Sequence, residues 1–421
     1  MIARPATINS VRALLLLALA LPALAADRIS SPYESIRPLL QQLAPPELKS
    51  ANARAFAAWS KEKDAAIRAR LEQGDLDSMV NLLLFGTSFT TQPRMTIDNL
   101  GAETRAGLLR SRLDDLLKAV NNPGANERLQ FLRTLLAGKN AGPFLLENLQ
   151  RVLKEKIEIN SRIAEQDSTE NAFSTRGVSL DTTILPNYAI DAALRDLKSR
   201  SLLPAVIRAA IVGPGLDFID KESGFDYYPL QTLQPFAVHD SLRRLNPATN
   251  PSITILDISP RVLAHIASLR TRTSYTIQLP RNATLQWTPA ALDYWRSFGP
   301  ESVDPIPTPA NLKNVETRAA RFPLPPIDAA DLNIVAQQLT LKPAEKFDLI
   351  VATNILVYYD PFEQALALSN IAAMLKPGGF LLTNDQLPDA PSIPMHLIDR
   401  TTVVYSEQPR TTDTVFWYRR Q

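Results

Sequence analysis

Two glycines follow a strongly apolar run in the C-terminal half of the chain. The run ends at Val212, and Gly213, Pro214 and Gly215 come directly after it. Glycine lets a backbone turn tightly and lets a ligand approach the backbone closely. The pattern is therefore typical of a nucleotide-binding loop, although an ordinary turn at the end of a strand has the same composition.

A carboxylate closes the next β-branched run. Asp257 is the last residue of the run 253–257, and Ser259 and Pro260 after it suit the first positions of a helix. A carboxylate at the tip of the second strand of a nucleotide-binding sheet can accept both ribose hydroxyl protons. The alternative is that Asp257 is only a negative charge near a helix N-terminus.

A carboxamide and two tyrosines follow a later run. Residues 347–352 have the pattern of a buried strand, and Asn354, Tyr358 and Tyr359 come after it. Open α/β sheets bind ligands just beyond the carboxyl ends of their strands. Asn354 could equally be a local cap or turn residue.

Strands that alternate with helices must position these groups. From Val206 onward, short β-type runs alternate with helical patterns, which predicts βαβ units around a parallel sheet. The interval from Gly215 to Asp257 is about twice the 20 residues usual in such units, so it must hold a loop and a helix. Residues 401–406 and 414–418 predict a terminal antiparallel hairpin. The predicted fold class is therefore α/β, with a Rossmann-like, mainly parallel sheet that ends in this hairpin.

The first part of the chain has a different pattern. Residues 26–164 carry leucines at helical spacing, which predicts an all-α N-terminal domain before the α/β domain of residues 187–421. Residues 165–186 are polar and rich in Ser and Thr, as in a linker or a wrapping loop. Residues 1–25 combine a basic start, a short apolar run and an Ala-Leu-Ala end, which is typical of a bacterial signal peptide. We expect an exported protein, periplasmic or secreted, without a membrane span after cleavage; an uncleaved anchor or a buried helix is the alternative.

Two segments carry a resemblance to a known family. FDLIVATNILVYYD at 347–360 and MLKPGGFLL at 374–382 are similar to class I S-adenosylmethionine (SAM) methyltransferases, most nearly the chemotaxis-receptor glutamate methyltransferases. The resemblance implies SAM as the cofactor. It also implies these cofactor-binding residues: Gly213, Pro214, Gly215, Asp257 for the ribose with Ile258 beside it, Asn333 for the adenine, and Asn354 for the methionine moiety.

The sequence also departs from that family. Ile211 stands where the family usually has an acidic residue, and Asp217 stands where a third glycine is expected. Asp217 could compensate by binding the amino group of the cofactor. Receptor-docking features are not recognisable, so the methyl acceptor is an unknown small molecule or protein. Candidate substrate-facing residues are Tyr228, Tyr358 and Tyr359, although such aromatics more often pack in a core.

Composition excludes several other functions. The 45 Lys and Arg residues nearly balance 43 Asp and Glu residues, so no nucleic-acid partner is expected. The chain has no cysteine and only three scattered histidines, so no metal site is expected. Methyl transfer mainly requires alignment of the reacting groups, so it needs no catalytic triad. Two alternatives stay open: an exported, non-catalytic binding or scaffold protein with a degenerate methyltransferase fold, and a nicotinamide-dependent oxidoreductase, against which the missing G-x-G-x-x-G argues.

Overall fold

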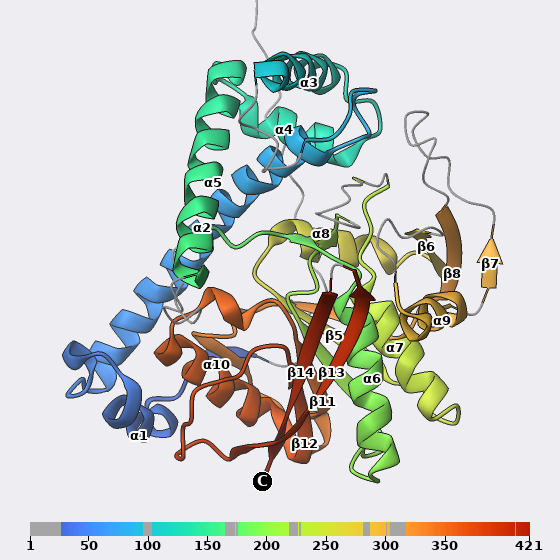
Figure 1. Ribbon diagram of the computed structural model, residues 1–421. Helices are drawn as coiled ribbons and strands as arrows, with labels where there is room; N and C mark the ends of the chain where they lie inside the picture. The colour runs from blue at the N-terminus through green and yellow to red at the C-terminus, as the bar shows by residue number, and fades with distance from the viewer. Residues whose placement is uncertain are drawn as a thin grey trace, which may run out of the picture.

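A seven-stranded sheet forms the centre of the computed structural model (Figure 1). Its strand order is β13-β14-β12-β11-β3-β5-β9. Strands β12, β11, β3, β5 and β9 are parallel, and β14 is antiparallel to both of its neighbours. The strands are β3 (Arg208–Val212), β5 (Ser252–Asp257), β9 (Ile327–Asp331), β11 (Phe347–Ala352), β12 (Leu375–Thr383), β13 (Met395–Glu407) and β14 (Arg410–Arg420). The sheet is therefore mainly parallel, as expected of a Rossmann-like fold.

The structure describes most of the chain. The described residues are 27–95, 103–164, 173, 176–218, 226, 229–280, 287–299, 301–303, 317–408 and 410–421. The expected signal peptide, 1–25, and Tyr228 lie outside them. None of the described helices is both long and apolar enough to cross a membrane.

The central strands are buried on both faces. All six residues of β11 are buried, which explains its continuous apolar run. In β3, Ala209 and Ile211 belong to one core cluster, whereas Ala210 and Val212 belong to another. Alternate side chains of a strand point to opposite faces of the sheet, so these clusters are the cores on its two sides.

Helices cover both faces. The first core includes residues of α6 (Pro186–Ser199), α7 (Gln234–Leu245), α8 (Pro260–Leu269) and α9 (Pro289–Ser297). The second includes residues of α1 (Tyr33–Leu43), of the first half of α2 (Ala53–Phe85) and of α10 (Pro361–Met374). The second half of α2 joins α3 (Glu103–Asn121), α4 (Glu127–Leu136) and α5 (Ala141–Ala164) around a third core. Figure 1 shows α2 running from the α3–α5 layer down to α1 beside α10.

The N-terminal region differs from the expected separate all-α domain. Strand β1 (Arg28–Ser30) pairs antiparallel with β10 (Gln337–Leu339). Ile36, Phe56 and Ile67, from α1 and α2, lie in the same core as β3 and β11. The helical periodicity was a correct guide to these helices, but it does not say which surface an apolar stripe covers. That surface is the sheet.

Smaller sheets complete the architecture. Strand β2 (Asp181–Thr182), at the end of the predicted linker 165–186, pairs in parallel with β4 (Leu216–Asp217). Strands β6 (Ser274–Pro280), β8 (Thr317–Pro323) and β7 (Glu301–Val303) form an antiparallel sheet in that order. The end of the linker is thus hydrogen-bonded to the segment that follows the glycine turn.

Candidate functional site

A crevice lies at the carboxyl ends of β3, β5, β9 and β11. The chain passes from β3 to β5 on one side, whereas β11 lies on the other side of β3, so the strand order reverses between β3 and β11. Ligands of open α/β sheets bind outside the strands at such a switch point. The described lining residues are Leu71, Val178, Ser179, Leu180, Val212, Gly213, Gly215, Leu256, Asp257, Ile258, Leu332, Ile334, Ile355 and Tyr359. We call this site the crevice.

The crevice is narrow and mostly apolar. Its cavity volume is about 40 Å³. That volume admits a water molecule, whereas small-molecule sites usually measure about 300–1,000 Å³. Its lining combines residues at the strand ends with Leu71 of α2 and residues 178–180.

The predicted glycine turn is at the crevice. Gly213 and Gly215 have φ angles of 61° and 65°, a conformation that favours glycine. A Cβ on Gly213 would overlap the side chain of Ile355, and one on Gly215 would lie 2.5 Å from the carbonyl oxygen of Leu180. Pro214 between them is buried. Close approach to the backbone therefore occurs here, but the approaching groups belong to the chain itself.

Asp257 also lines the crevice, beside Ile258. It ends β5 and pairs in register with Asp331 of β9. One carboxylate oxygen accepts a hydrogen bond of 2.7 Å from the backbone N–H of Ser259. Its residue exposure is 7%, and this burial raises the pKa of Asp257 to about 7. A carboxylate among apolar groups is the kind of sparse polar feature that orients a ligand.

Asp217 lies beyond the described lining of the crevice. It is 1% exposed, and its carboxylate is 3.5 Å from the side-chain amide of Gln231. Burial raises its pKa to about 8. Arg128 donates a hydrogen bond of 2.7 Å to its backbone oxygen. Its binding of a cofactor amino group stays a prediction.

Asn333 is fully buried and bound to other parts of the chain. Its side-chain amide donates a hydrogen bond of 2.9 Å to Asp64 of α2, and its side-chain oxygen accepts one of 3.1 Å from Val335 N–H. Its neighbours Leu332 and Ile334 line the crevice instead. The segment therefore borders the crevice, whereas the contact of the Asn333 side chain with adenine stays a prediction.

Asn354 is exposed and has a φ angle of 58°. Its backbone N–H donates to the side-chain oxygen of Asn384 at 2.8 Å, and the amide of Asn384 donates back to Asn354 at 2.6 Å. This reciprocal pair links the ends of β11 and β12. Among the described residues, Ile355 rather than Asn354 lines the crevice.

The two described tyrosine candidates differ. Tyr359 is 3% exposed and lines the crevice, and burial raises the pKa of its hydroxyl. Tyr358 is half-buried, and its hydroxyl hydrogen-bonds to the backbone of Ser179. Burial raises its pKa as well. Thus Tyr359 faces the site, whereas Tyr358 contacts the segment that closes it.

Sequence reasoning missed Leu71 and residues 178–180. Leu71 lies within a long helix, and residues 178–180 lie in a segment interpreted as a linker. Gly74 and Gly177 were the only hint in the sequence that helix and linker meet, because each glycine allows a close approach of two backbones. The sequence does not show that these two glycines lie next to each other. In the part of the chain that the structure describes, no group of three His, Asp or Glu residues could hold a metal ion.

The comparisons with known proteins give partial likeness only. The sequence matches no protein-family model, and no curated protein matches it. Among solved structures, it is similar to magnesium protoporphyrin IX methyltransferase from Synechocystis PCC 6803 with bound S-adenosylhomocysteine (SAH), at 9% identity and a TM-score of 0.28, over 63% of this chain and 99% of that chain. The mitomycin 7-O-methyltransferase MmcR is 14% identical with a TM-score of 0.29, over 89% of this chain and 100% of that chain. The sugar N-methyltransferase KedS8 from Streptoalloteichus sp ATCC 53650 is 11% identical with a TM-score of 0.24, over 56% of this chain and 73% of that chain. All three are methyltransferases, but with TM-scores this low the likeness identifies neither the family nor the function of this chain.

Proposed function

We propose that the crevice is a SAM site and that the chain is a SAM-dependent methyltransferase with an unknown methyl acceptor. One observation carries the proposal. The glycine turn at Gly213 and Gly215, the carboxylate of Asp257 and the ring of Tyr359 come from distant parts of the chain and line one crevice. That crevice lies at the switch point of a doubly wound sheet, where nucleotide-like ligands bind.

The chemical types of the lining residues suit SAM, but the cavity is smaller than the cofactor. Asp257 offers a carboxylate suited to ribose hydroxyls, and the apolar side chains of Leu256, Ile258 and Leu332 suit an adenine ring. A cavity of about 40 Å³ is too small for an adenosyl group. The bound cofactor would supply the methyl group and its leaving group, whereas the chain would bind, orient and exclude water.

The acceptor stays undefined in this proposal. The resemblance to chemotaxis-receptor methyltransferases concerns residues 347–360 and 374–382. It is not extended to a receptor glutamate, because the sequence lacks recognisable receptor-docking features. Export of the protein through residues 1–25 is part of the proposal and would separate the chain from cytoplasmic SAM.

The closed crevice favours a second candidate. In an exported scaffold with a degenerate methyltransferase fold, Leu71, Leu180 and Ile355 would fill the former cofactor site permanently. The two candidates differ in whether the filling side chains can leave. They therefore differ in whether any SAM binds.

Titration calorimetry with SAM, SAH and NAD tests the proposal. We expect SAM and SAH to bind, NAD not to bind, and Asp257→Ala to weaken binding of the first two by at least about tenfold. Asp328→Ala is the matched control, because Asp328 is on the neighbouring strand β9 and its half-exposed side chain pairs with Arg270. Unchanged affinity in Asp257→Ala would remove Asp257 from the site, and binding of NAD alone would replace the methyltransferase by an oxidoreductase.

A further inference from the structure

Residues 176–182, here called the strap, contribute three residues to the lining of the crevice. These are Val178, Ser179 and Leu180, which line it together with residues at the strand ends. Val178 and Leu180 are each 6% exposed, so they are packed inside the molecule rather than lying on its surface. The strap thus packs against the glycine turn at Gly215.

The strap binds the backbone just after the glycine turn. The N–H of Leu216 donates a hydrogen bond of 2.9 Å to Leu180 O, and the N–H of Phe218 donates one of 3.1 Å to Thr182 O. The carbonyl oxygen of Leu180 is also the atom that a Cβ on Gly215 would approach to 2.5 Å. A glycine turn of this kind usually presents its backbone to a ligand. Here it presents the backbone to the strap.

Helix α2 holds the strap from the other side. The N–H of Val178 donates to Arg70 O at 3.0 Å, and Arg70 Nε donates to Arg176 O at 2.8 Å. A Cβ on Gly74 would overlap the carbonyl oxygen of Val178 and lie 3.0 Å from Ser179 N, and one on Gly177 would lie 2.5 Å from Gly74 N. Two glycines therefore allow helix and strap to touch backbone to backbone.

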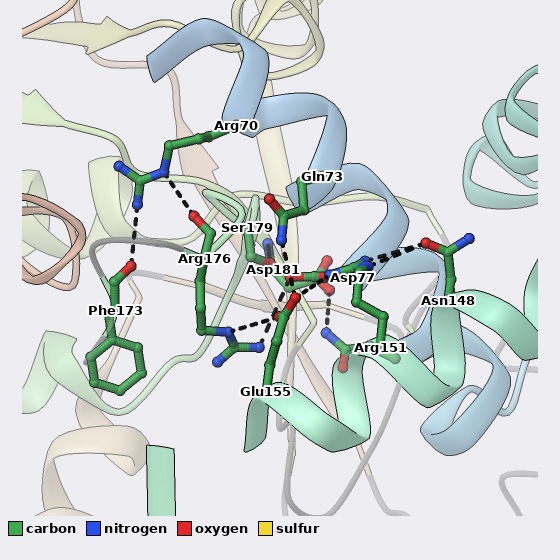
Figure 2. A network of polar contacts seen from close by, with 11 residues as sticks. Arg70, Gln73, Asp77, Asn148, Arg151, Glu155, Phe173, Arg176, Ser179 and Asp181 are labelled. Carbon is green, nitrogen blue, oxygen red and sulfur yellow. Dashed lines mark hydrogen bonds and ion pairs between the residues drawn. The ribbon is translucent and has the colours of Figure 1, made fainter. Parts of the chain in front are cut away.

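Arg176, the first residue of the strap, makes only long ionic contacts (Figure 2). Arg176 lies 3.7 Å from Glu155 and 3.9 Å from Asp77, whereas Arg151 of α5 binds the same Asp77 at 2.6 Å. Both distances are longer than the 2.6 Å between Arg151 and Asp77, so the ionic contacts of Arg176 are weaker than that of Arg151. Asp77 and Glu155 keep Arg151 as a partner when the strap leaves. Asp181 of the strap is buried, lies 3.4 Å from Arg128 and accepts a hydrogen bond of 3.0 Å from Asn81, so complete departure of the strap has to break this buried pair.

We propose that the strap is an internal occupant of the crevice, and that it must leave before a ligand enters. This inference rests on the proposed function for the identity of the ligand, but not for the motion itself. A site that is competent only in the open state binds with an affinity reduced by the fraction of molecules that are open. Any partner or condition that displaces the strap would therefore activate binding.

Gly74→Ala tests the inference without altering a residue that lines the crevice. The added methyl overlaps the strap backbone, whereas alanine suits the helix itself. Gly107→Ala is the matched control, because Gly107 lies in α3 with no atom within 4 Å of the added methyl. We expect hydrogen exchange of the Leu216 and Phe218 amides to accelerate by about tenfold or more in Gly74→Ala only. Equal protection in both variants would overturn the inference.

Calorimetry with SAH on the same proteins separates this inference from the proposed function. We expect Gly74→Ala to bind SAH about tenfold or more tightly than wild type and Gly107→Ala. Faster exchange without any SAH binding would uphold the strap and overturn the SAM site. If wild type binds SAH as tightly as Gly74→Ala while the amides of Leu216 and Phe218 stay protected, the strap does not need to leave, and the inference is wrong.

Gly177→Ala is a second variant in case Gly74→Ala does not fold. It places the methyl on the strap, and the overlap is with the backbone of Gln73 and Gly74. The strap then has to move away from a helix whose own sequence is unchanged. The same acceleration of exchange at Leu216 and Phe218 is expected, and its absence in a folded Gly177→Ala protein would contradict the inference.

Discussion

The carboxylate of Asp257 is buried, although burial disfavours its charged form. The folded chain raises its pKa from 3.8 to about 7, chiefly through burial, so between these pH values the folded state holds a proton that the unfolded state releases. The contribution of Asp257 to the free energy of unfolding is therefore most favourable below about pH 4, and it is lost as the pH rises through about 7. A shift of this size corresponds to a loss on the order of 4 kcal/mol.

The variant Asp257→Asn should remove this loss, because it keeps the size of the side chain and cannot ionise. We expect its free energy of unfolding in urea to fall less than that of wild type between pH 4.5 and 8. Burial raises the pKa of Asp217 to about 8, so this group also makes the protein less stable as the pH rises. It accounts for part of the decrease in stability that remains in Asp257→Asn. Parallel curves for wild type and Asp257→Asn would contradict the prediction.

Gly213 combines a positive φ with a close neighbour. In Gly213→Ala the backbone conformation costs about 1–3 kcal/mol, and the overlap with Ile355 adds to it. The control is Gly378→Ala, because Gly378 has a φ of 80° but only the Arg419 side chain near, at 3.7 Å. We expect Gly213→Ala to lose more stability in urea unfolding than Gly378→Ala, and equal losses would show that Ile355 moves away freely.

Single residues could be predicted where a strand ends. Gly213, Asp257 and Tyr359, three candidates from the sequence, all line the crevice, because the carboxyl ends of parallel strands meet at one edge of a sheet. Their contact with a ligand stays a prediction. Asn333 and Asn354 are bound to Asp64 and Asn384, which lie far away in the sequence. A residue pattern identifies the position of a carboxamide, but not the partner that holds its side chain.

At the scale of elements, helix α10 has a strong N-terminal signal. The Asp360 carboxylate accepts a hydrogen bond of 2.8 Å from Glu363 N–H, and Glu363 accepts one of 3.0 Å from Asp360 N–H. This capping box satisfies two backbone donors that a helix start otherwise leaves free. Asp360→Ala should lower the free energy of unfolding by about 1 kcal/mol.

Asp360→Asn is the control for this cap, because asparagine caps a helix about as well as aspartate. We expect its thermal melting curve to lie close to that of wild type and above that of Asp360→Ala. If both variants lose the same stability, the negative charge at Asp360 matters more than the hydrogen bond.

The strap shows why some elements could not be predicted. The strands β3, β5 and β11 carry continuous apolar runs, because helices cover both of their faces. The strap has a short apolar stretch in a polar segment, and it is held by backbone bonds to α2 and β4 and by the buried side chain of Asp181. Backbone hydrogen bonds are open to any sequence, so they leave no residue pattern to read.

At the scale of the whole molecule, the N-terminal helices and the sheet share a core. The sequence predicted helices in residues 26–164 and a sheet in 187–421, and the structure has both. It did not predict that α1 and the first half of α2 pack on the sheet, because every amphipathic helix offers an apolar stripe to any apolar surface. We therefore expect that the boundary between the two sequence patterns is not a boundary between independent folding units.

A fragment of residues 187–421 should consequently fail to fold stably. It would lose Ile36, Leu39, Leu40, Phe56 and Ile67, each 2% exposed or less, from the face of the sheet that they cover. Each such side chain contributes about 1.5–3 kcal/mol when buried, and their sum is comparable with the 5–15 kcal/mol that stabilises a typical protein. Residues 27–421 are the control, and near-UV circular dichroism with binding of an apolar dye is the measurement. We expect the fragment to lose its near-UV signal and to bind the dye, whereas a cooperative melt of the fragment at the temperature of the control would show that the sheet is stable without α1 and α2.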